Sequence, residues 1–264
     1  MLALHLTHLH YTQLNSTTWC ATAQASESLC LIFEALKTQA SWLLIARTPY
    51  LGLYKFAELN WQYYAAPFTI SAKKIAYNQR QLQRKGVRLL LQKLLSKLKI
   101  SDTLDESDFP YQLIDSKYYV CFSHTSGNTK ISASENPVQA LSRQLNSNVA
   151  VVISRHRPVG IDIENNNIAW RVAQRFYSDN EIATIQSLPT IQRNSIIKLL
   201  WQIKESFIKI RQYMLAQGLG MDYAYLINDL IEAMKNKSHM IVIVDYRSDY
   251  HVTVLPIQQT VVIF

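Results

Sequence analysis

Two acidic residues of this chain, Asp162 and Glu164, stand two positions apart in the β-type run 159–164. Residues i and i+2 of a strand share a face, so both carboxylates point the same way while Ile161 and Ile163 point into a core. Carboxylates this close raise each other's pKa unless a cation lies between them. A hard divalent cation such as Mg²⁺, which takes oxygen ligands, would resolve the repulsion. An ordinary amphipathic edge strand with solvated acids is the alternative, and the pattern taken alone favours it.

A second group of polar side chains follows helical spacing over residues 194–213. Glu205 and Lys209 form an i,i+4 pair of the favoured orientation, which can simply stabilise a helix surface. Glu205 gains chemical meaning only if the fold brings it to the other two carboxylates. One polar stripe and one apolar face are expected: Lys198, Gln202, Glu205, Lys209 and Gln212 on the first, and Ile196, Leu199, Leu200, Ile203, Phe207 and Ile210 on the second.

Phosphate-binding groups are suggested at two further places. Ser123 and His124 lie where a β-type run ends in a hydroxyl-rich turn with Gly127, and the main-chain N–H groups of such turns bind phosphate. The run lacks the G-x-S-x-G spacing of a hydrolase elbow, and a lone histidine at a strand end is more often structural. Three arginines recur at i, i+4 and i+8 and form either a phosphate-binding ladder or a solvated face: Arg80, Arg84 and Arg88.

The elements that must position these residues are read from periodicity and turn signals. In the first part of the chain we expect a strand at 3–11, a helix at 26–39 and a long helix at 71–100 with a kink or junction at Gly86. An acidic linker at 102–108 and strands at 118–122 and 148–154 follow, with a polar insertion between the two strands. Residues 42–67 have no clear periodicity.

The second part of the chain repeats a similar order of elements. We expect a strand at 159–164, helices at 180–187 and 194–213, and a hairpin of strands at 240–246 and 251–256. The chain is therefore expected to be an α+β protein of two similar halves, 1–157 and 158–264.

Composition limits the partners. Among 264 residues, 27 Lys and Arg against 19 Asp and Glu give a formal net charge of +8, which favours an anionic partner. Three cysteines without C-x-x-C spacing argue against a disulfide framework or a cysteine zinc site and suit a reducing cytoplasm. The longest apolar runs are too short to span a membrane, and the N-terminus lacks the pattern of a signal peptide.

Taken in order, these features resemble the 4′-phosphopantetheinyl transferase family, in its single-chain, surfactin-synthetase-activating form. The family signature is a G-[IV]-D-x-[ED] strand followed by W-x-x-K-E-[AS]-x-x-K, and residues 160–164 and 201–209 match it at every defining position. Weaker similarities occur in the family's order at 87–91, 122–124, 175–178 and 218–220. The chain departs from the family at Phe109-Pro110, where a lysine often precedes the proline, and in a longer interval between His124 and Asp162.

The resemblance implies a pseudo-dimer of two α+β halves with coenzyme A in the cleft between them. The implied reaction transfers 4′-phosphopantetheine from coenzyme A to a serine of an acyl or peptidyl carrier protein, depends on Mg²⁺ and releases 3′,5′-ADP. The implied roles are Mg²⁺ binding by Asp162, Glu164 and Glu205, catalysis by Glu205, Lys204 and Lys209, and coenzyme A binding by Arg88, Ser123, His124, Lys204 and Lys209, with Arg84 as a further contact.

Two other functions remain open at the level of the sequence. A Mg²⁺-dependent phosphodiesterase or nuclease also gathers carboxylates and favours a basic surface, but no aromatic-interleaved nucleic-acid motif is present. A non-catalytic relative that binds coenzyme A without turnover is the other alternative. We expect neither nucleic acid nor membrane as a partner, and a cytoplasmic monomer, since two halves in one chain remove the need for a dimer.

Overall fold

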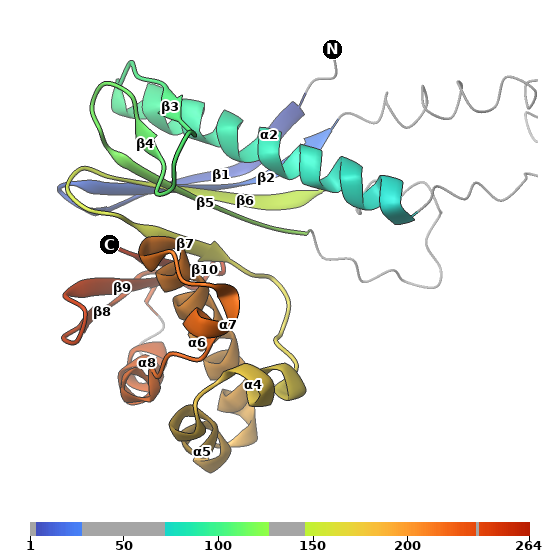
Figure 1. Ribbon diagram of the computed structural model, residues 1–264, viewed down its shortest axis with the longest axis vertical. Coiled ribbons are helices and arrows are strands. Elements are labelled where there is room, and N and C mark those ends of the chain that lie inside the picture. The colour runs from blue at the N-terminus through green and yellow to red at the C-terminus, as the bar shows by residue number, and fades with distance from the viewer. Residues whose placement is uncertain (1–3, 28–71, 127–145, 236–237) are drawn as a thin grey trace, which may run out of the picture.

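The computed structural model describes residues 4–27, 72–126, 146–235 and 238–264. In these ranges the chain forms two antiparallel sheets and six α-helices, which confirms the predicted α+β class. The two sheets lie face to face, and helices cover their outer faces (Figure 1). The order of layers is therefore helix, sheet, sheet, helix.

All strands of the first sheet come from residues before 155. Its strand order is β1-β2-β6-β5-β4-β3, and α2 lies on its outer face (Figure 1). The elements are β1 (Leu4–Asn15), β2 (Thr18–Glu27), α2 (Ala72–Leu98), β3 (Leu104–Asp105), β4 (Gln112–Leu113), β5 (Tyr119–Ser126) and β6 (Ser147–Ser154).

All strands of the second sheet come from residues after 159. Its order is β7-β10-β9-β8, so β7 is an edge strand. The elements are β7 (Gly160–Ile163), α4 (Trp170–Phe176), α5 (Asp179–Ser187), α6 (Thr190–Arg211), α7 (Leu215–Leu219), a 3₁₀ turn (Ala224–Leu226), α8 (Ile227–Lys235), β8 (Ile241–Asp245), β9 (Tyr250–Leu255) and β10 (Thr260–Ile263).

Three apolar clusters hold the layers together because each element presents its apolar side inward. The leucines of α2, such as Leu90 and Leu94, are buried against the first sheet. Cys121 of β5 and Ile161 of β7 belong to the cluster between the two sheets. The apolar face predicted for α6 is buried against the neighbouring helices α4, α5 and α8 and against the second sheet, and Ile203 has no exposed surface.

Most predicted elements in the described ranges are confirmed, with shifts of their ends, but β5 continues to Ser126, so Ser123 and His124 lie in the strand and not in the predicted turn. The predicted kink at Gly86 is wrong: α2 is one continuous helix through this residue. A Cβ atom at Gly86 would lie 2.9 Å from the Cβ of Ala25, so the glycine lets the helix approach the sheet closely. The sequence did not predict β2, β3, β4, β10, α4, α7 or α8. The helix expected at 26–39, the unassigned stretch 42–67 and most of the polar insertion fall largely outside the described residues.

Gly160, the first residue of the predicted signature, is required by the contact between β7 and α6. A Cβ atom at this position would lie 2.2 Å from the main-chain oxygen of Ser206. We expect Gly160→Ala to lower the free energy of unfolding by about 1–3 kcal/mol, because the strand and the helix must separate. Urea unfolding of the full chain measures this. Gly220→Ala is the milder comparison, since its Cβ would lie 3.3 Å from the main-chain oxygen of Ala216, a tight contact that needs a much smaller shift; equal losses in both variants would contradict the explanation.

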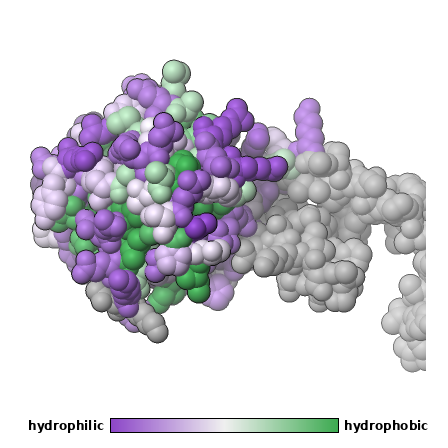
Figure 2. All heavy atoms as spheres, turned by 90° about the horizontal axis from the view of Figure 1, so that it is seen from below, coloured by the Kyte–Doolittle hydropathy of each residue, from purple (hydrophilic) through white to green (hydrophobic). Residues whose placement is uncertain are grey.

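No helix in the described ranges is long and apolar enough to cross a membrane. The face turned toward the viewer in Figure 2 mixes hydrophilic and hydrophobic side chains, and no single type covers it.

Candidate active site

A cavity of about 520 Å³ lies between the two halves of the chain and collects most of the predicted site residues. Arg88, Ser123 and His124 come from the first half, and the carboxylates and Lys209 come from the second. The full lining is Arg84, Val87, Arg88, Phe109, Tyr111, Cys121, Phe122, Ser123, His124, Asp162, Ile163, Glu164, Trp201, Glu205 and Lys209. Of the residues predicted to act in the site, only Lys204 is missing from this lining.

The three carboxylates reach this cavity from two elements. Asp162 is on β7 and Glu164 directly follows it, whereas Glu205 is in the C-terminal half of α6. Burial raises the pKa of Glu205; Lys209 opposes this effect, and the charges of Asp162 and Glu164 add to it. A carboxyl group whose pKa lies above its ordinary value is suited to accept a proton near neutral pH.

Lys209 lines the cavity beside Asp162. Its Nζ donates to Asp162 Oδ1 at 3.1 Å and to the main-chain oxygen of Ile161 at 2.7 Å. Burial alone would lower the pKa of Lys209, but the nearby Asp162, Cys121 and Glu205 outweigh burial and raise it. The ammonium group therefore stays charged beside the carboxylates, and its recorded ion pair is with Asp162 rather than with Glu205.

Ser123 is placed differently from what the resemblance implies. Its side chain is buried, its Oγ donates to Asp162 Oδ1 at 2.9 Å, and the same oxygen accepts from the main-chain N–H of Ile163 at 3.1 Å. The hydroxyl is thus already engaged and is not free to hold a phosphate in this arrangement. His124, the next residue of β5, is exposed and lines the cavity.

Two arginines of α2 form the basic wall of the cavity. Arg84 and Arg88 line it, whereas Arg80, the third member of the predicted ladder, does not. The guanidinium group of Arg88 forms an ion pair with Glu106 at 2.7 Å and donates to the main-chain oxygen of Arg84. An anion that binds Arg88 would have to share it with Glu106 or displace Glu106.

Lys204 does not reach the cavity, which corrects the prediction that it binds phosphate. Its side chain has no exposed surface, and its ammonium group lies 2.8 Å from Glu181 Oε2. It also donates to the main-chain oxygens of Leu219 and Met221. Glu181 in turn caps α5 through Ser178. Lys204 therefore joins α6 to α5 and to the segment after α7.

The loop from 102 to 116 supplies two cavity residues: Phe109, which the sequence marked only as a departure from the family, and Tyr111, for which it predicted no role. Phe109 and Tyr111 line the cavity, and their rings meet edge to face at 5.1 Å. Gln212, at the end of α6, donates to the main-chain oxygen of Phe109 at 2.5 Å. The aromatic Phe109 occupies the place where the family often has a lysine, so this wall of the cavity is apolar instead of basic.

Asp102 closes that loop and makes its stability pH-dependent. Partial burial raises the pKa of Asp102, but hydrogen bonds from Ser116, Asp115 and Thr103 outweigh it and hold the pKa at about 2. Because the folded pKa lies below the ordinary value of about 3.9, the stabilisation is complete above pH 4 and is lost between about pH 4 and pH 2.

We expect Asp102→Asn to lower the free energy of unfolding by about 1 kcal/mol at pH 7, since hydrogen bonds to the charged group are weakened. The difference from the unsubstituted chain should shrink as the pH falls toward 2. Urea unfolding at several pH values measures it, with the exposed Asp108→Asn as control. A difference that stays constant down to pH 2 would refute the assignment.

Asp162, Glu164 and Glu205 are the residues that could hold a metal ion. Their ligand atoms are all oxygens, which suits Mg²⁺, and they line one cavity. As the side chains stand, no three His, Cys, Asp or Glu residues of the described ranges are arranged as a metal site. The carboxylate oxygens of these three residues therefore fit Mg²⁺ by their chemistry, and we propose below that they bind the ion.

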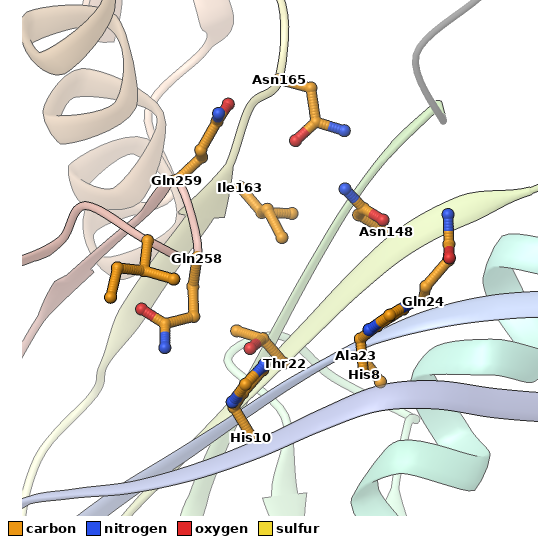
Figure 3. A pocket seen from close by; sticks show the side chains of 11 residues that line it. His8, His10, Thr22, Ala23, Gln24, Asn148, Ile163, Asn165, Gln258 and Gln259 are labelled. Atoms are coloured by element: carbon orange, nitrogen blue, oxygen red, sulfur yellow. The ribbon is translucent and has the colours of Figure 1, made fainter.

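A second cavity, of about 390 Å³, lies at another part of the interface between the sheets. Figure 3 shows His8 and His10 of β1 facing Gln258 and Asn165 across it. None of the residues that line it is Lys, Arg, Asp or Glu. It lacks the carboxylates that hold Mg²⁺ and the lysines and arginines that pair with phosphate, so the first cavity is the better candidate for that chemistry.

Residues 158–254 match the model of the 4′-phosphopantetheinyl transferase superfamily. This match confirms the resemblance that the sequence motifs predicted. The chain is 37% identical over 73 residues to 4′-phosphopantetheinyl transferase psf-1 of Bacillus pumilus, which is 27% of this chain and 31% of that protein. It is 44% identical over 74 residues to 4′-phosphopantetheinyl transferase gsp of Aneurinibacillus migulanus, 28% of each chain. It is 42% identical over 53 residues to 4′-phosphopantetheinyl transferase ffp of Bacillus subtilis, 20% of this chain and 24% of that protein.

The match to the superfamily covers only part of the cavity. Asp162, Glu164, Glu205 and Lys209 lie inside the matched range, whereas the wall formed by α2 and β5 lies outside it. The similar segments span about a quarter to a third of the length of the curated relatives. The contribution of the first half to the site therefore comes from the structure and from the weaker motifs.

Proposed function

We propose that this protein transfers the 4′-phosphopantetheine group of coenzyme A to a serine of an acyl or peptidyl carrier protein, with Mg²⁺, and releases 3′,5′-ADP. One observation carries the proposal: three carboxylates and Lys209 meet two arginines in a single cavity between the halves. The carboxylates come from the segment that matches the transferase superfamily. Anionic and cationic groups together suit a ligand that carries phosphates and a divalent cation.

The reaction needs a proton acceptor and stabilisation of phosphate charge. The carrier serine oxygen attacks the phosphorus that bears pantetheine, and the bond from this phosphorus to the bridging oxygen breaks, so that 3′,5′-ADP leaves with the bond electrons. Glu205 takes the serine proton, directly or through a water molecule. Lys209 stabilises the charge on the phosphate oxygens. Mg²⁺ held by Asp162, Glu164 and Glu205 would neutralise the pyrophosphate when bound.

The basic wall would bind the nucleotide end of coenzyme A. Arg84, Arg88 and His124 face the same cavity and offer donors for the 3′-phosphate. Arg88 has to exchange Glu106 for this phosphate, and Phe109 and Tyr111 offer apolar surface for a base. The net charge of +8 suits both the coenzyme and an acidic carrier protein.

We also propose that the two halves, 1–157 and 158–264, form a pseudo-dimer that works as a cytoplasmic monomer. The support is that each half consists of an antiparallel sheet with a long helix on its outer face. In such a pseudo-dimer, the cavity between the halves corresponds to a site between the two subunits of a true dimer.

Transfer is tested by intact-mass spectrometry of an apo carrier protein incubated with the full chain, coenzyme A and Mg²⁺. The expected result is a mass gain of one phosphopantetheine arm that disappears when Mg²⁺ is chelated. Carrier proteins of fatty-acid, polyketide and peptide synthesis should each be tested in parallel. Coenzyme A with Mg²⁺ should also raise the melting temperature of the protein, because a ligand of the folded state stabilises it.

The two alternatives give different results in the same experiments. A phosphodiesterase or nuclease would be stabilised by single-stranded DNA and would hydrolyse phosphodiesters without modifying a carrier. A non-catalytic relative would be stabilised by coenzyme A but would transfer nothing to any carrier. Absence of both transfer and stabilisation by coenzyme A would overturn the proposed function.

A further inference from the structure

Strands β5 and β7 belong to different sheets, yet two side chains of β5 form hydrogen bonds to Asp162 of β7 and to Glu164, which directly follows β7. Ser123 Oγ donates to Asp162 Oδ1 at 2.9 Å, and Thr125 Oγ1 donates to Glu164 Oε1 at 3.3 Å. Both pairs have the same separation of 39 residues. The two hydroxyls and the two carboxylates thus stand in register, each set at positions i and i+2 of its own segment.

These hydrogen bonds occupy one oxygen of each carboxylate. Asp162 Oδ1 also accepts from Lys209, and Glu164 Oε1 also accepts from the main-chain N–H of Asn166 at 2.8 Å. Within the described ranges, no donor is recorded for Asp162 Oδ2 or Glu164 Oε2. Hydrogen bonds that fix one oxygen of a carboxylate restrict the rotation of the group and so orient the other oxygen.

The two hydroxyls are buried, and Ser123 and Thr125 are only 5% and 8% exposed. Neighbouring carboxylates repel each other, so without donors their side chains would turn apart. Donors supplied from the opposite sheet counteract this repulsion without adding a positive charge that would compete with a cation.

We propose that Ser123 and Thr125 are positioning residues that hold Asp162 and Glu164 ready to bind a divalent cation. The inference rests on the proposed function for the role of the cation. It means that the cation site is completed by the first half of the chain although all three carboxylates belong to the second. It also gives Ser123 a role different from the phosphate binding that the resemblance implies.

The test is the affinity of the full chain for Mn²⁺, measured from the electron paramagnetic resonance signal of free Mn²⁺. We expect Thr125→Val and Ser123→Ala each to weaken Mn²⁺ binding by about tenfold or more, the usual effect of losing a group that orients a ligand. Thr125→Ser should bind nearly as the unsubstituted chain does, because it keeps the hydroxyl. Thr125→Ala and Thr125→Ser form a second pair if the valine variant does not fold.

The chain offers matched controls. Thr253 and Ser147 are fully buried, and their hydroxyls have no hydrogen-bond partner in the described residues. Thr253→Val and Ser147→Ala make the same chemical changes away from the carboxylates and should leave Mn²⁺ affinity unchanged. A weakening that also occurs in these controls would identify the effect as a general loss of packing and overturn the inference.

Asp162→Asn separates this inference from the proposed function. If Asp162→Asn weakens Mn²⁺ binding but Thr125→Val and Ser123→Ala do not, the positioning role is wrong and the proposed cation site stands. If Asp162→Asn binds Mn²⁺ as the unsubstituted chain does, the proposed cation site is wrong and the positioning role falls with it.

Discussion

Glu205→Gln is expected to lower the rate of carrier-protein modification by about a thousandfold or more, the usual contribution of a general base. The substitution keeps the size of the side chain but removes its charge. It therefore takes away both a proton acceptor and one of three oxygen ligands for Mg²⁺ in the cavity. The Glu205 side chain makes no hydrogen bond or ion pair with other described residues, so the folded state should lose little.

The rate is measured by intact-mass spectrometry at saturating coenzyme A, and folding by thermal melting. Glu232→Gln, at an exposed position of α8, is the matched control and should keep full activity. Because burial and the neighbouring carboxylates disfavour a charged Glu205, the variant should melt at the same temperature as the unsubstituted chain or slightly higher. Full activity of Glu205→Gln would exclude both roles of this residue.

Lys204→Met is expected to lower the free energy of unfolding by about 3–5 kcal/mol, the usual cost of removing one partner of a buried ion pair. Lys204 and Glu181 both have no exposed side-chain surface. Loss of the ammonium group removes one hydrogen-bond donor from the Glu181 carboxylate and from the main-chain oxygens of Leu219 and Met221. Burial lowers the pKa of Lys204, and the nearby Glu181 and Asp222 counteract only part of this effect.

Urea unfolding followed by tryptophan fluorescence measures this loss. Lys93→Met is the control, since Lys93 is an exposed lysine of α2 and should cost little. The double variant Lys204→Met with Glu181→Leu should recover part of the stability, because an apolar pair avoids an unpaired buried charge. Unchanged stability of Lys204→Met together with a large loss of coenzyme A affinity would contradict this structural role and indicate that Lys204 belongs to the active site.

Local periodicity predicted the elements that carry the three carboxylates of the second half, and the resemblance to the transferase family predicted that they act together. The i, i+2 spacing of Asp162 and Glu164 in a strand and the helical position of Glu205 follow from local periodicity, and the structure places all three in one cavity. Local periodicity also predicted the buried face of α6, since apolar side chains at helical spacing have to turn toward a core. These features need no information about distant parts of the chain.

The different surroundings of the two lysines of the signature could be found only from the tertiary structure. Lys204 and Lys209 are five positions apart, which corresponds to about 140° around a helix, so they point to different surroundings. Which of them meets substrate depends on what packs on each side of α6. Glu181 occupies one side and β7 the other, and only Lys209 lines the cavity.

The contribution of the first half also depended on tertiary packing. Whether Ser123 binds a ligand or a carboxylate, and whether Gly86 bends a helix or lets it approach a sheet, is decided by contacts between segments far apart in the chain. The pairing of Arg88 with Glu106 is of the same kind. Residue types and spacing therefore determined which groups could do chemistry here, and the packing of the two sheets decided which of those groups meet, because only packing brings distant side chains within bonding distance.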